Sequence, residues 1–165
     1  LDWGRAALDE KDWRGIALAS AMLPYPSEKA KYEPFDHYLI GLGFLSKTDI
    51  HMQFEPNAYD EFFRALKSGM RVYGAWDGKE PFEPAFNRTV QQIIPTLDAA
   101  ERKKYLDLGE QFAAHPPAEL FPITLSEVGA MKVLCDGYFS HVFRYLANAR
   151  ADAEKQGKNE SGTAT

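Results

Sequence analysis

Cysteine is almost absent from the chain: only Cys135 among the 165 residues carries a thiol, so no disulfide can form within it. A single free cysteine favours a reducing compartment, and we expect a cytoplasmic protein. The chain begins with Leu1 instead of methionine, so a cleaved targeting segment stays open as an alternative. Cys135 falls on the apolar face of a predicted helix, where we expect a small buried hydrophobe and no nucleophile.

Long apolar runs and dense basic clusters are also lacking. No run approaches the roughly 20 apolar residues that span a bilayer, so we expect no membrane insertion. The net charge is −5, and the densest basic groups, residues 29–31 and 102–104, have acidic neighbours. Because a phosphate backbone is bound by clustered Lys and Arg, we expect no nucleic-acid partner.

Motifs for catalysis or cofactor binding are missing as well. The sequence contains no H-E-x-x-H, no Glu-x-x-His pair and no G-x-S-x-G, and its Gly41-Leu42-Gly43 lacks the spacing of a phosphate loop. We therefore assign no catalytic residue and expect no cofactor. The weak candidates for a metal or acid–base site are His37, His51 and Glu55, because His51 and Glu55 stand four residues apart.

What the chain does have is apolar and aromatic content. Hydrophobic residues make up 45% of it, with 11 Phe, 8 Tyr and 3 Trp. This is enough to build one core at this length. We expect a single helical domain over residues 1–150, followed by a polar C-terminal tail over residues 151–165.

The clearest helix signal lies near the C-terminus. Thr124-Leu125-Ser126-Glu127 has the pattern of a capping box, and apolar residues then recur at helical spacing. The pattern predicts a central helix over 125–150 that ends near Arg150. Its predicted apolar face consists of Val128, Met131, Leu134, Cys135, Tyr138, Val142, Tyr145 and Leu146.

Other helix starts are marked by proline and by capping residues. Glu-Pro pairs at 33–34, 55–56 and 83–84 each precede aromatics at helical spacing, and proline suits the first helical turn. Gly69 predicts the end of the second of these helices, and Pro95 the end of the third. Asp98 predicts a cap for a helix over 98–114. Two further helices are predicted over residues 2–10 and 12–23.

These signals together predict an all-α fold, an irregular bundle of six to seven helices joined by proline-rich loops. The segment 70–76 alternates in polarity, which leaves three alternatives: a short strand, a frayed helix end or a loop. The two glycines Gly41 and Gly43 are predicted to allow close packing between helices.

The function predicted from this pattern is a non-enzymatic protein-interaction module: an adaptor, an inhibitor, an immunity-type protein or an assembly subunit. Another protein is the expected partner, and the oligomeric state is open. Large aromatics in loops often anchor partners, so the predicted contact residues are Tyr25, Tyr73 and Trp76. The alternative is a ligand-binding or metal-dependent catalytic domain with an aromatic-lined pocket that uses His37, His51 or His141.

Overall fold

The computed structural model describes residues 28–47, 54–114 and 122–161. Residues 26–142 form one compact unit, which contains the candidate site. Residues 143–161 belong to a second unit, in which they form the C-terminal part of the last helix. The predicted helices over 2–10 and 12–23 lie outside the described residues.

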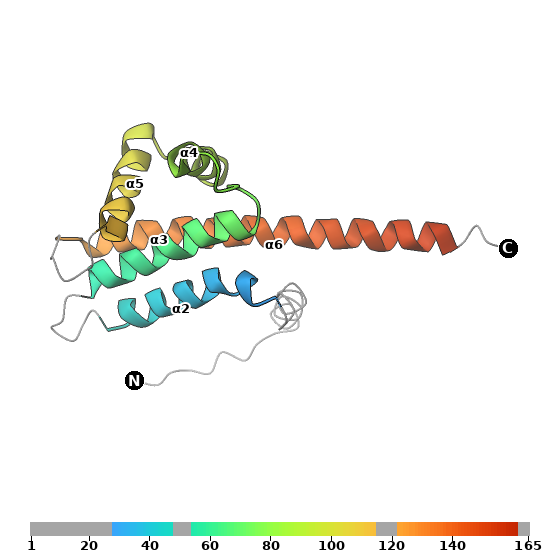
Figure 1. The fold of residues 1–165 in the computed structure, drawn as a ribbon, viewed down its shortest axis with the longest axis horizontal. Coiled ribbons are helices and arrows are strands. Elements are labelled where there is room, and N and C mark those ends of the chain that lie inside the picture. The colour runs from blue at the N-terminus through green and yellow to red at the C-terminus, as the bar shows by residue number, and fades with distance from the viewer. Residues whose placement is uncertain (1–27, 48–53, 115–121, 162–165) are drawn as a thin grey trace. The chain divides into compact units, whose positions relative to one another are not determined.

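The described part of the chain is all-helical, as the sequence predicts, and contains no strand (Figure 1). Over these residues there are five α-helices instead of six to seven, preceded by one short 3-10 turn. Their bounds are η1 Lys29–Lys31, α2 Glu33–Leu45, α3 Glu55–Val72, α4 Phe82–Ile93, α5 Ala99–Ala114 and α6 Leu125–Ser161.

The Glu-Pro pairs mark helix starts. α2 begins at Glu33 and α3 at Glu55, each with proline in the first turn, and α4 begins one residue before Glu83. Proline is tolerated there because the first backbone N–H groups of a helix have no partner within it.

Both predicted side-chain caps are present. The Asp98 carboxylate accepts a hydrogen bond from the Glu101 backbone N–H at 2.8 Å, which begins α5. At the start of α6, the Thr124 N–H donates to Glu127 at 2.8 Å, and the Glu127 N–H donates to the Thr124 hydroxyl at 3.3 Å. This reciprocal pair is a capping box.

The end of α3 differs from its prediction. Gly69 does not stop the helix. It serves in packing instead: its missing side chain makes room for the rings of Tyr138 and Phe139, both 3.1 Å from where a Cβ would lie. The helix continues through Val72 and ends beside Gly74, whose φ is +82°. Of the three alternatives for residues 70–76, the short strand is therefore wrong: residues 70–72 end α3, and the rest of the segment is loop.

α6 is longer than predicted. It does not end near Arg150 but continues to Ser161. The sequence after Arg150 is rich in Ala, Glu, Lys and Gln, which have high intrinsic helix propensity, so a helix can persist there without an apolar face. Of the predicted apolar face, six residues are buried, whereas Tyr145 is 69% exposed.

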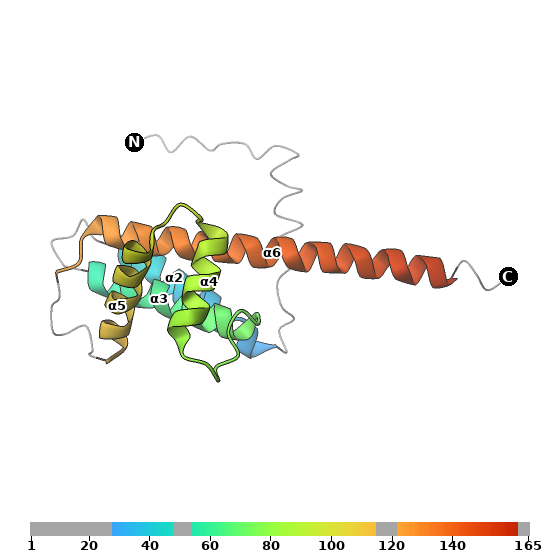
Figure 2. The same cartoon turned by 90° about the horizontal axis from the view of Figure 1, so that it is seen from above.

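The core of the 26–142 unit is built around α3, which shares it with α6. Ten of the 18 residues of α3 are buried, and Phe62 and Phe63 point to different neighbours. Phe62 packs against Gly41 of α2, where a Cβ would lie 2.8 Å from its ring. At Gly43, by contrast, an added Cβ would have no described atom within 4 Å. Phe63 packs against Gly109 of α5. α3 thus lies between α2 and the α4–α5 pair, which crosses it in Figure 2.

Candidate partner-binding groove

An open groove runs along the outer face of α3. Its volume is about 810 Å³, and we call it the charged groove. α2 and η1 form one wall, and α5 and the loop after α3 form the other. Its lining residues are Ala30, Glu33, His37, Arg64, Lys67, Ser68, Arg71, Val72, Trp76 and Ala113.

Trp76 lies at the end of this groove, in the loop of residues 73–81, which we call the Trp76 loop. Its backbone N–H donates to the Met70 carbonyl at 2.9 Å, which satisfies a carbonyl at the end of α3. Its indole N–H donates to the Glu80 carbonyl at 2.9 Å, and its ring meets Phe82 edge-on at 5.1 Å. The indole is half-buried, so it both fixes the loop and presents a surface.

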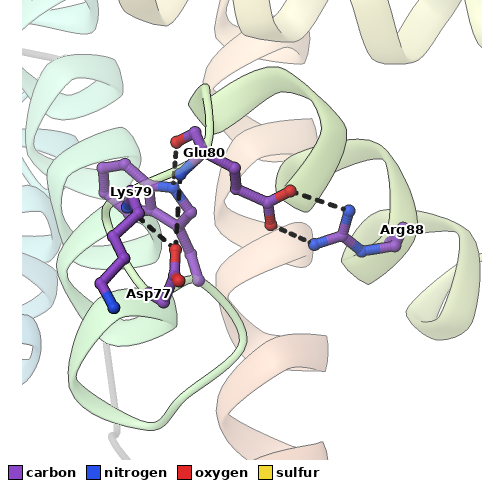
Figure 3. Close-up of polar contacts among 5 residues, drawn as sticks. Asp77, Lys79, Glu80 and Arg88 are labelled. Carbon is purple, nitrogen blue, oxygen red and sulfur yellow. Dashed lines mark hydrogen bonds and ion pairs between the residues drawn. The ribbon is translucent and has the colours of Figure 1, made fainter.

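The rest of the Trp76 loop is held by a carboxylate turn, shown in Figure 3. The Asp77 carboxylate accepts hydrogen bonds from the backbone N–H groups of Lys79 at 2.9 Å and Glu80 at 3.4 Å. Gly78, with φ of +77°, permits the tight turn. The Glu80 carboxylate receives two hydrogen bonds from the Arg88 guanidinium of α4. The loop is therefore fixed at both ends before any partner binds.

Three cations line the charged groove from α3. Arg64, Lys67 and Arg71 are three and four residues apart, which places them on one face of the helix. Lys67 is tied to α5 through Glu110 at 2.7 Å, and its ammonium lies 4.9 Å from the centre of the Phe82 ring. The Lys67 ammonium therefore already has two partners within the fold.

Arg64 is also paired, with an unusual partner. Its guanidinium lies 2.8 Å from one carboxylate oxygen of Asp60, which is only 3% exposed. The other oxygen of Asp60 has no hydrogen-bond partner among the described residues. A buried carboxylate is costly without a counter-charge, and the Arg64 guanidinium supplies one to Asp60.

Arg71 differs from the other two cations. It is exposed, and within the described ranges it forms no ion pair or hydrogen bond. Its Nε lies 3.9 Å from where a Cβ on Gly78 would be, so its guanidinium lies beside the Trp76 loop. Arg71 is the cation of the groove that can bind an incoming anion without first breaking an internal pair.

On the α2 side, His37 forms a pair with an acid of α3. Its Nδ1 lies 2.7 Å from Glu61, and its Nε2 lies 4.0 Å from Glu33. Among the residues that the structure describes, no group of three His, Cys, Asp or Glu side chains could hold a metal ion. Glu55 lies in the first turn of α3. His51 lies outside the described residues, so the set of His37, His51 and Glu55 stays a prediction.

Cys135 is fully buried, as the sequence predicts. Its thiol donates a hydrogen bond to the Phe62 carbonyl at 3.0 Å. Burial raises the pKa of this thiol far above its ordinary value. Because the thiolate is the nucleophile of cysteine chemistry, Cys135 in this structure is a packing residue.

The other predicted site residues have separate environments. The Tyr73 hydroxyl donates to the Lys31 carbonyl at 3.2 Å, and its ring contacts Phe35 edge-on. Burial raises the pKa of this hydroxyl to about 12. Tyr73 therefore connects the end of α3 to η1 and α2. His141 is exposed on α6, and Tyr25 lies outside the described residues.

The cations of α3 were missed at the sequence level. A dense basic run is the usual signal for a charged site, and these three are instead spread over eight residues. The usable signal was helical spacing: once residues 55–72 are predicted as a helix, Arg64, Lys67 and Arg71 fall on one face.

Comparison with known proteins gives no family for this chain. No family model, no curated protein and no solved structure matches it. None of the described helices has a stretch both long and apolar enough to cross a membrane.

Proposed function

We propose that the chain is a non-enzymatic helical interaction module that binds another protein through the charged groove and Trp76. The observation that carries the proposal is an open groove of about 810 Å³ that is lined by the half-buried Trp76 and by Arg71, an arginine with no ion pair among the described residues. Tryptophan and arginine are the residue types most enriched where binding energy concentrates in interfaces.

The rigidity of the Trp76 loop supports this proposal. Its indole is hydrogen-bonded to Glu80, and Glu80 is in turn held by Arg88. A partner that contacts a preformed loop does not have to order it, and that lowers the entropic cost of association. Helix α3 and its core provide a firm base beneath the groove.

The alternative, a ligand-binding or catalytic domain with an aromatic-lined pocket, has less support. Trp76 is the one Phe, Tyr or Trp among the residues that line the charged groove. The aromatic residues of α3 lie in the core. His37 is paired to Glu61 at one wall, with no metal-binding group around it in the described part.

The proposal is tested by identifying a partner and measuring its affinity. The full chain is used for affinity capture from its native host, and each captured protein is purified and titrated against the wild type and Trp76→Ala. We expect Trp76→Ala to weaken binding by at least about fivefold, because truncation of an anchor residue costs more than about 1 kcal/mol.

A matched control separates binding from folding. Leu39→Ala removes a side chain that is 63% exposed on α2 and does not line the groove, so it should leave the affinity unchanged. Trp76→Phe keeps an aromatic ring against Phe82, so it tests whether a loss of binding in Trp76→Ala comes from a collapsed loop. If a folded Trp76→Ala bound every partner as tightly as the wild type, the proposed contact would be wrong.

A further inference from the structure

A second groove lies on the other side of Trp76 and has the opposite charge. Its volume is about 430 Å³, and it shares only Lys67 and Trp76 with the charged groove. We call it the acidic groove. Its lining residues are Lys67, Trp76, Glu80, Pro81, Phe82, Glu83, Leu106, Asp107 and Glu110.

The two grooves differ in the sign of the charged side chain that has no ion pair among the described residues. In the acidic groove, Glu80 is paired with Arg88 and Asp107 with Lys103, whereas Glu83 is exposed and has no ion pair within the described ranges. On the other side, Arg71 is the cation without an ion pair in the part of the chain that the structure describes. An acidic side chain near Trp76 is therefore attracted toward Arg71 and repelled from Glu83.

We infer that the partner contributes an acidic segment, which places one Asp or Glu side chain on Arg71 and an apolar side chain against the Trp76 indole. This inference rests on the proposed function and adds the chemistry of the partner. A guanidinium binds a carboxylate through two parallel N–H donors, and none of those of the exposed Arg71 donates to another described residue.

The shape of the charged groove fits a peptide segment better than a small carboxylic acid. The charged groove is open and continues past Ser68 and Arg64 to His37, so it can take an extended chain. A free carboxylate ion would gain only the Arg71 contact, whereas a segment also gains the apolar contact with Trp76. The net charge of −5 opposes acidic ligands at long range, so the short-range pair has to supply the selectivity.

The test uses a library of displayed 12-residue peptides selected on the full chain. The best binder is synthesised again with each Asp replaced by Asn and each Glu by Gln. Each peptide is titrated against the wild type and Arg71→Gln. We expect one acidic replacement to weaken binding to the wild type about tenfold and binding to Arg71→Gln less than about twofold.

The control is Lys47→Gln, which also removes one exposed positive charge but lies just after α2, outside both grooves. It should retain the full preference for the acidic peptide. Arg71→Lys should retain part of it, because lysine keeps the charge and loses the paired donors.

The outcomes separate this inference from the proposed function. If Trp76→Ala abolishes peptide binding but acidic and amide peptides bind equally well, the inference is overturned and the proposed function stands. If free glutamate binds as tightly as the peptide, the site takes small acids and the inference is also overturned. If neither Trp76→Ala nor Arg71→Gln changes peptide binding, both fail.

Discussion

The two faces of α3 differ in what their side chains are used for. The inner face carries Phe62, Phe63 and Leu66, which are at most 1% exposed and packed against three neighbouring elements. The outer face carries Arg64, Arg71 and half-buried Lys67 along an open groove. The same helix therefore stabilises the fold with one face and offers a charged surface with the other.

The two faces of α3 differ in how much their side chains contribute to the free energy of unfolding. Burial of a phenylalanine side chain contributes about 1.5–3 kcal/mol to stability, whereas an exposed ion pair contributes about 0–1 kcal/mol. The outer face is thus not explained by stability alone. Substitutions on the two faces, ordered from the largest expected effect to the smallest, should separate these roles.

Phe62→Ala should have the largest effect. Its ring fills the space left by Gly41 and lies 5.5 Å from the Tyr38 ring, so truncation leaves a cavity between α2, α3 and α6. We expect the free energy of unfolding to fall by about 3–5 kcal/mol in chemical denaturation. A loss below about 1 kcal/mol would show that the inner face does not carry the fold.

Gly109→Ala should come next. A Cβ at this position would lie 2.2 Å from the Phe63 ring, so α5 or the ring has to move. We expect a loss of about 1–3 kcal/mol, measured in the same way. Gly43→Ala is the control, since nothing lies within 4 Å of its added methyl group, and alanine should be neutral or stabilising by up to about 1 kcal/mol there.

Glu127→Gln should have a smaller, pH-dependent effect. A hydrogen bond from Lys104, and then one from the Thr124 backbone, lower the pKa of Glu127 from 4.5 to about 2. We expect a loss of about 1 kcal/mol at neutral pH from the weakened cap and ion pair. Thermal unfolding of both proteins across a pH series measures it.

The sign of the pH dependence follows from the direction of that shift. Because the folded pKa of Glu127 lies below its unfolded value, its contribution is complete above about pH 5 and is lost as the pH falls toward 2. The gap between the wild type and Glu127→Gln should therefore narrow in that range. A gap that stayed constant down to pH 2 would mean that the charge of Glu127 has no role.

Arg71→Gln should have the smallest effect on stability. Its side chain is exposed and forms no ion pair among the described residues, so we expect a change within about 0.5 kcal/mol. Its effect on partner binding should still be large, because the proposed contact with an acidic segment depends on its guanidinium. A marked loss of stability would place Arg71 among the residues that hold the fold and would weaken the contrast between the two faces.

Much of the fold could be predicted from local sequence signals. The capping residues Asp98 and Thr124 and the Glu-Pro pairs work within one helical turn, so they can be recognised without knowing the tertiary structure. The end of α3 could not be predicted in this way. Gly69 is a helix stop by propensity, but contact with Tyr138 and Phe139 of a distant helix decides its role.

The candidate site was only partly predictable. Trp76 was recognised because a large aromatic in an irregular segment stands out. The packing role of Tyr73 could not be predicted, because its contacts with Lys31 and Phe35 join segments far apart in the sequence. That Arg71, unlike Arg64 and Lys67, has no ion pair among the described residues likewise follows only from the tertiary structure.

Amide hydrogen exchange of the full chain, free and with the captured partner bound, most directly tests whether the charged groove and Trp76 bind the partner. We expect slower exchange in the complex for residues 73–80 of the Trp76 loop and the last turn of α3, with little change in the outer face of α2 around Leu39. Slower exchange confined to segments outside the charged groove, with the Trp76 loop unchanged, would contradict this assignment.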